Sequence, residues 1–193
     1  MVVTNHFIFG QFDNAEREEF LDQYLADYEK TVAAAEGSGL RVLLGAELRF
    51  AQNHNDYLLF GADREILATC YDYLPKGLEA FRREVKLPNS VFVQSHPFRD
   101  GMTPIDVSLL DGIETFNMHP GHNSRIGFAA RCVKEHDLPI RTVGTDFHHK
   151  NRGHEAVSAL RCATLPADSF ELASLLRSGE YVFEIGEDAI VLP

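Results

Sequence analysis

The stretch Val91–Arg99, VFVQSHPFR, joins a short apolar run to a polar end that carries a histidine. Its first four residues are β-rich and largely apolar on both faces, which is typical of a buried parallel strand. Similar runs recur along the chain at Val2–Thr4, Arg41–Gly45, Tyr57–Phe60, Gly112–Phe116 and Arg141–Val143. Runs of this kind separated by helical patterns predict an α/β fold with a parallel sheet, either barrel-like or open.

Helical patterns fill the intervals between the runs. Asp13 or Asn14 is placed to cap a long helix reaching Glu36, whose apolar face would hold Phe20, Leu21, Tyr24, Leu25, Tyr28 and Val32. Four more helices are predicted: Arg64–Tyr73, Leu78–Val85, Arg125–His136 after a Ser124 cap, and one from an Asp168 or Ser169 cap to near Gly179. No repeat or linker interrupts the pattern, so we expect residues 1–193 to form a single domain.

The composition is that of an ordinary soluble globular protein, with 45% hydrophobic and 24% charged residues. The net charge of -11 disfavours a general binder of long nucleic acids. The three cysteines show no CxxC spacing, which favours buried thiols in a reducing compartment over disulfides. No signal peptide or membrane-length apolar window is evident, so a cytoplasmic protein without a membrane partner is expected.

Residues suited to metal chemistry follow five of the six runs. They are His6, Glu47, His96, then His119 and His122, and finally Asp146 and His148. Because parallel strands end at one rim, these side chains are expected to converge there. Asp146 and His148 are two residues apart, a spacing that in an extended segment points both side chains the same way. His54 precedes a run and is expected at the opposite rim.

Each of these residues also has an ordinary interpretation. A lone histidine after a strand is most often a turn or surface residue, and Glu47 alone is consistent with a helix cap or a surface charge. His119 and His122 are consistent with ligands, substrate contacts or turn residues, and we favour substrate contact for at least one. The combined set of imidazoles and carboxylates suits Zn²⁺, Mn²⁺ or Fe²⁺ better than Ca²⁺.

The motifs at these strand ends resemble the PHP family, named for the polymerase and histidinol phosphatase domains. The matching segments, in family order, are Val3–His6, Gly45–Glu47, Ser95–Phe98, Gly112–Asn117 and Gly144–His148. The resemblance implies a distorted, TIM-like (β/α)7 barrel that hydrolyses phosphoesters with two or three metal ions. For this chain we expect one to three divalent ions of zinc, manganese or iron. It implies His6, Glu47, His96, Asp146 and His148 as metal ligands, and Asn117, His122 and Arg99 near the substrate.

The family usually opens with a His-x-His strand, which does not precede His6 here. We therefore expect a barrel without its first strand, or a natural start upstream of Met1. The first alternative leaves an open sheet edge at Val2–Thr4. The tail segments Tyr181–Ile185 or Ala189–Leu192, or a second copy in a homodimer, are expected to cover that edge.

The predicted reaction is hydrolysis of a small phosphomonoester by a metal-activated water. A histidine or aspartate at the rim, His122 or Asp146, is expected to transfer the proton, and Arg99 to hold a phosphate oxygen. An ordinary surface position is the alternative for Arg99. The alternative for the whole chain is a non-catalytic PHP-like binding or regulatory domain with an incomplete metal site. Histidinol phosphate, a nucleotide or another small phosphoester all remain open as substrates.

Overall fold

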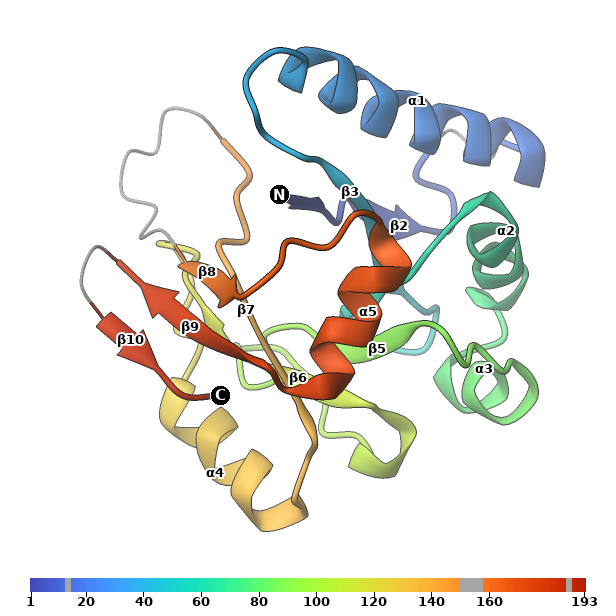
Figure 1. Ribbon diagram of the computed structural model, residues 1–193. Helices are drawn as coiled ribbons and strands as arrows, with labels where there is room; N and C mark the ends of the chain where they lie inside the picture. Colours follow the sequence, from blue (N-terminus) through green and yellow to red (C-terminus); the bar gives the residue numbers. More distant parts are fainter. Residues whose placement is uncertain (13–14, 150–157, 187–188) are drawn as a thin grey trace.

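The computed structural model describes residues 1–12, 15–149, 158–186 and 189–193. It is a mixed α/β structure whose seven-stranded sheet curls into a half-barrel, with a smaller antiparallel sheet beside it (Figure 1). The strand order of the large sheet is β1-β3-β4-β5-β6-β7, and β2 also pairs with β3. Its strands are β1 (Val2–Val3), β2 (His6–Ile8), β3 (Leu43–Arg49), β4 (Tyr57–Phe60), β5 (Val91–Gln94), β6 (Gly112–Asn117) and β7 (Ile140–Gly144). The small sheet contains β8 (Ser158–Cys162), β9 (Tyr181–Ile185) and β10 (Ala189–Val191).

Five α-helices and one 3₁₀ turn lie among the described residues. They are α1 (Arg17–Ala35), α2 (Arg64–Tyr73), α3 (Leu78–Glu84), η1 (Val107–Leu109), α4 (Ile126–His136) and α5 (Ser169–Ser178). Asp168 caps α5 as predicted, because its carboxylate accepts from the backbone N–H groups of Phe170 and Glu171. The predicted Ser124 cap of α4 is wrong: this hydroxyl donates to the carbonyl of Asn117 instead.

The long first helix differs from the expectation at both ends. It begins after Glu16, which makes no side-chain cap, and the predicted caps Asp13 and Asn14 lie outside the described residues. Its buried face holds Phe20, Leu21 and Tyr24, whereas Val32 in the last turns is 37% exposed. The helix packs on the sheet through its first half.

None of the helices among the described residues is long and apolar enough to cross a membrane.

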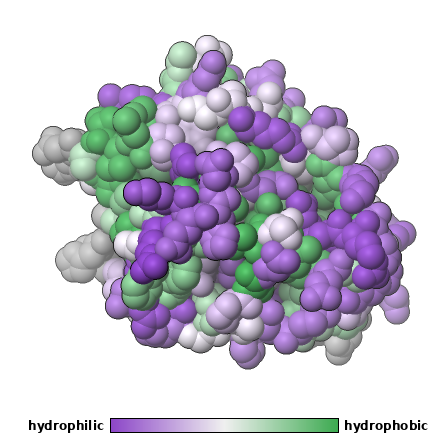
Figure 2. All heavy atoms as spheres, turned by 90° about the horizontal axis from the view of Figure 1, so that it is seen from below, coloured by the Kyte–Doolittle hydropathy of each residue, from purple (hydrophilic) through white to green (hydrophobic). Residues whose placement is uncertain are grey.

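Two apolar cores lie on the two faces of the curled sheet. Helices α1 to α4 cover the outer face, where their side chains pack with Phe7, Leu48 and Phe92. The concave face is filled by α5 and β9, which pack on Leu43, Leu58 and Val93 (Figure 1). The surface seen in Figure 2 is mostly hydrophilic, with its apolar groups in separate patches.

Strand β4 runs antiparallel to both β3 and β5, which corrects the prediction of an all-parallel sheet. Only residues 50–56 connect β3 to β4, and a parallel crossover needs a dozen or more residues. The start of β4 therefore lies at the same rim as the ends of β3 and β5. The prediction that His54 faces the opposite rim is wrong for this reason.

The sheet has β1 and β2 at one edge and β7 at the other, and no pairing among the described residues joins them. The tail strands β9 and β10 pair with each other, and β9 also pairs with β8. Among the described residues the tail strands therefore do not pair with β1, while Val2 packs against the core that contains Tyr181 and Phe183.

The junction between β1 and β2 is held by α1. The Tyr24 hydroxyl lies 2.9 Å from the carbonyl oxygen of Gly45 and 3.1 Å from that of Asn5. This contact fastens the short N-terminal strands to β3 and aligns His6 with Glu47 in the parallel register.

Candidate metal centre

Alternate residues of a strand face the same side of a sheet. On the concave side of this sheet, these residues are apolar in the core and polar toward one rim. On β3 this face runs from Leu43 in the core to Glu47 at the rim. On β4, which runs the opposite way, it leads from Leu58 back to Asp56. His96 lies two residues beyond the end of β5. The apolar core on the concave side thus sets which polar side chains gather at the rim.

Glu47, Asp56 and His96 form a buried cluster there, with exposed fractions of 7%, 1% and 2%. His96 Nε2 lies 3.4 Å from Glu47 Oε1 and 3.7 Å from Asp56 Oδ2. One ligand-type atom of each residue lies within 4.8 Å of the others, and His6 adds its Nε2 3.3 Å from Glu47 Oε2. Imidazole nitrogens combined with carboxylate oxygens are a donor set for Zn²⁺, Mn²⁺ or Fe²⁺. The residues therefore fit such an ion.

Burial and charge oppose each other in this cluster. Burial raises the pKa of Glu47, but hydrogen bonds from His6 and His96 lower it more, so that its pKa is about 2. The hydrogen bond to Glu47 raises the pKa of His6. Burial lowers the pKa of His96, yet Glu47 and the nearby Glu114 raise it by more. The cluster without metal thus pairs a carboxylate with protonatable imidazoles, and a divalent ion would displace those protons.

Two arginines surround Asp56. Arg49 makes a bidentate pair with it, from Nε to Oδ1 at 2.6 Å and from Nη2 to Oδ2 at 2.9 Å. Arg99 lies 3.6 Å from Asp56 Oδ2 and 3.4 Å from His96 Nε2, so it is a rim residue and not an ordinary surface arginine. Arg49 compensates the charge of Asp56, which makes Glu47 and His96 the stronger ligand candidates.

The loops after β6 and β7 place a second group of side chains around Asp146. His148 Nδ1 lies 3.2 Å from Asp146 Oδ1, and His122 Nδ1 lies 3.6 Å from Oδ2. Asn117 donates to Asp146 Oδ2 at 3.2 Å, and the rings of His119 and His122 stack with centroids 3.9 Å apart. Burial lowers the pKa of His122, which favours the neutral form of this imidazole.

Histidine ring contacts join the two groups into one continuous rim. The centroids of His6 and His148 are 5.7 Å apart, and those of His96 and His122 are 6.4 Å apart. His6 lies on an edge strand and His148 follows the strand at the other edge, so the curl of the sheet brings both edges together here. All the predicted site residues share this rim: His6, Glu47, His96, Arg99, Asn117, His119, His122, Asp146 and His148.

Asp146 and His148 meet for a different reason from the one predicted. Strand β7 ends at Gly144, and Asp146 has a φ of 49°, so the segment is irregular and not extended. His148 Nδ1 also lies 2.8 Å from the Asp146 carbonyl oxygen. His96 shares the left-handed backbone, with a φ of 31°. Non-glycine residues adopt this region at an energetic cost, which concentrates backbone strain at the rim.

Glu114 on β6 is a site residue that the sequence interpretation did not single out. Its Oε2 accepts from the His96 backbone N–H at 2.8 Å, from Asn117 at 3.0 Å and from the Ser95 hydroxyl at 3.2 Å. Burial raises its pKa to about 7. A Cβ atom at Gly144 would lie 2.5 Å from Glu114 Oε1, so a larger residue there would force this carboxyl group to shift. The sequence did contain an indication of its role, because Glu114 lies in Gly112–Asn117, one of the segments that match the PHP motifs.

Asp56 and Arg49 were also missed. Asp56 precedes its strand, and with the direction of β4 taken as parallel it would have been placed at the far rim. Arg49 lies two residues after Glu47 on the same face of β3, a spacing that offered a signal.

No protein-family model matches this chain, and the curated proteins contain no match to it.

Proposed function

We propose that this chain is a metal-dependent phosphoesterase of the PHP type that hydrolyses a small phosphomonoester. The observation that carries the proposal is the buried Glu47–Asp56–His96 cluster, whose ligand-type atoms lie within 4.8 Å of one another. Buried carboxylates are costly unless paired or bound to a metal, and here they sit beside imidazoles at a strand-end rim. The ordered motifs of the sequence support the same family.

His6, Glu47 and His96 would hold a divalent ion, and Asp146 with His148 supplies further donors at the same rim. When bound, such an ion supplies Lewis-acid chemistry: it withdraws charge from a phosphoryl oxygen and lowers the pKa of water. One to three ions, of zinc, manganese or iron, are consistent with this donor set.

The remaining rim residues suit a phosphate substrate. Arg49 and Arg99 hold two guanidinium groups beside Asp56, where they would attract and orient an anionic group. Burial lowers the pKa of His122, and its Nδ1 lies 3.6 Å from Asp146 Oδ2, so this imidazole suits a proton acceptor or ligand better than a proton donor. Asn117 and His119 line the same rim and would contact the substrate.

The test is phosphatase activity of the chelator-treated protein before and after addition of Mn²⁺ or Zn²⁺. We expect activity on a panel of small phosphomonoesters only after metal is added. Glu47→Gln removes a charged ligand. It should therefore lower the number of metal ions bound per chain, and it should lower kcat/KM at least a hundredfold. The exposed Glu29→Gln makes the same chemical change elsewhere and should behave like the unaltered protein. Absence of turnover by metal-loaded protein across the panel would refute the proposal.

A non-catalytic binding or regulatory domain is the second candidate. The bidentate Arg49–Asp56 pair favours it, because that pair occupies both oxygens of one candidate ligand. Elemental analysis separates the two: two or more ions per chain support catalysis, whereas none supports the binding domain. A cytoplasmic location fits the free thiols of Cys70, Cys132 and Cys162. A homodimer that covers the β1 edge stays a prediction, which light scattering would test.

A further inference from the structure

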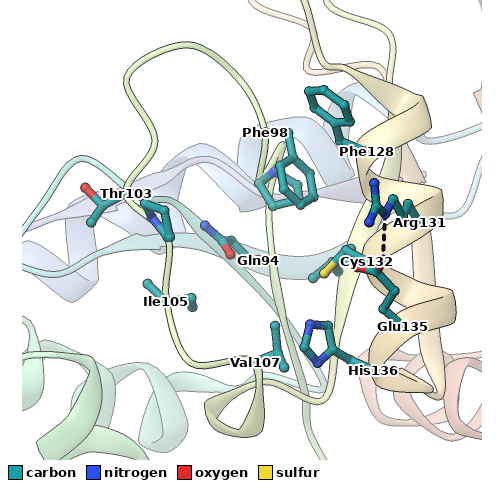
Figure 3. Close-up of a pocket in the computed structure, with 13 residues that line it drawn as sticks. Gln94, Phe98, Thr103, Ile105, Val107, Phe128, Arg131, Cys132, Glu135 and His136 are labelled. Carbon is teal, nitrogen blue, oxygen red and sulfur yellow. Dashed lines mark hydrogen bonds and ion pairs between the residues drawn. The ribbon is translucent and has the colours of Figure 1, made fainter.

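A pocket of about 360 Å³ lies on the outer face of the sheet, between α4 and the loop that follows His96 (Figure 3). Gln94 and its register partner Ile113 line this pocket, whereas the adjacent Ser95 and Glu114 meet on the concave side. Because successive residues of a strand face opposite sides, the sheet itself separates this pocket from the candidate metal centre.

The pocket is lined mainly by apolar groups. Phe98 and Phe128 stand at one end with their ring centroids 6.1 Å apart, edge to face. Phe128 is 57% exposed although it forms a pocket wall. Further apolar lining comes from Pro97, Pro104, Ile105, Val107 and Ile113. Volume and lining are those of a site for a small organic molecule.

Gln94 points its amide into this pocket, near the middle of the residues drawn in Figure 3. The residue is only 4% exposed, and its Nε2 has no hydrogen-bond partner among the described residues. A buried amide nitrogen without a partner is costly, and native structures satisfy nearly all such groups. A hydrogen-bond acceptor placed inside the pocket would supply the missing partner.

We propose that the pocket binds a small, uncharged, planar molecule whose edge carries an adjacent acceptor and donor, such as an aromatic carboxamide or a heterocyclic lactam. A glutamine amide offers one donor and one acceptor side by side, so it pairs with such an edge through two hydrogen bonds. The aromatic walls suit a flat ring. Arg131 and Glu135, which also line the pocket, pair with each other at 2.6 Å, so that their opposite charges offset one another.

Cys132 provides a readout that needs no enzymatic activity. It lines the pocket, whereas Cys162 lies on β8 in the small sheet and serves as an internal control. We expect benzamide to slow alkylation of Cys132 by iodoacetamide and to leave Cys162 unaffected. Calorimetry on the same protein should show a benzamide Kd on the order of 1 mM. Ethylbenzene, which lacks the polar edge, and benzoate, which is charged, should bind at least tenfold more weakly.

Two variants make the test decisive. Gln94→Leu should weaken benzamide binding about tenfold, and the exposed Gln23→Leu should leave it unchanged. Ile105→Trp, in the loop, should fill the pocket and abolish binding even if Gln94→Leu fails to fold. The proposal is overturned if benzamide neither binds nor protects Cys132 at 10 mM, a concentration about tenfold above that Kd. It is also overturned if ethylbenzene or benzoate binds as tightly as benzamide, or if Ile105→Trp binds it unchanged. None of these outcomes depends on phosphatase activity.

Discussion

Glu114→Gln tests whether the buried carboxyl group of Glu114 at the rim lowers the free energy of unfolding in the absence of metal. Burial raises the pKa of Glu114 from 4.5 to about 7, and its Oε2 accepts three hydrogen bonds. A pKa that is higher in the folded state means that the folded protein binds the proton more tightly. The contribution of Glu114 to stability is therefore complete below pH 4.5 and is lost as the pH rises to 7.

The magnitude follows from the size of the shift. Each pKa unit corresponds to about 1.4 kcal/mol, so the change from 4.5 to about 7 amounts to roughly 3 kcal/mol. Glutamine keeps an oxygen to accept the same hydrogen bonds and carries no charge at any pH. We expect the Gln variant to gain stability relative to the unaltered protein between pH 5 and pH 8, by up to about 3 kcal/mol.

Urea unfolding of both proteins with chelator present, at pH 5 and at pH 8, measures this difference. Comparing the two proteins at each pH cancels the titration of the groups that do not interact with Glu114. The titration of His96, whose pKa Glu114 raises, remains part of the measured difference. A difference in unfolding free energy that is the same at both pH values would refute the reasoning, as would a variant that is less stable at pH 8. Added Mn²⁺ should favour the unaltered protein, because a nearby cation stabilises the ionised carboxylate.

Three further perturbations follow from the structure. Gly144→Ala would place a Cβ 2.5 Å from Glu114 Oε1 and should cost about 1–3 kcal/mol in thermal unfolding; an unchanged melting temperature would contradict this packing. Tyr24→Phe removes the hydroxyl held between two backbone carbonyls and should cost about 1–2 kcal/mol in urea unfolding, whereas no loss would mean that this contact does not fasten β1 and β2. Cys70 is buried, which raises its thiol pKa, so in native protein a thiol reagent should modify Cys162 and spare Cys70 until urea is added; equal rates would count against this core.

Local sequence patterns predicted the position and type of most elements. Strands β4 and β5 and helix α2 have the predicted ends, because each is a run whose apolar spacing and flanking polar residues are read without reference to the rest of the chain. Strands β2 and β8 were missed. His6–Ile8 is too short to show a period, and Ser158–Cys162 is only partly buried.

The rim was predictable in part for the same reason. His6, Glu47, His96 and Asp146 lie two or three residues beyond the ends of apolar runs, so a rule about strand ends places them together. That rule assumes that every strand points the same way. The rule did not identify Asp56, because β4 is antiparallel and Asp56 precedes this strand. Side-chain periodicity shows which face of the sheet a residue occupies, but it does not show the direction of the strand.

The sequence by itself determined the α/β class, the order of the main strands and helices, and the candidate metal-binding chemistry of one rim, because these depend on neighbours close along the chain. Tertiary structure decided the direction of β4, the burial that raises the pKa of Glu114 and the meeting of His6 with His148 across the open side of the sheet. These depend on contacts between residues far apart in sequence. The curl of a sheet and the solvent excluded by packing are properties of the whole fold, and no local pattern encodes them.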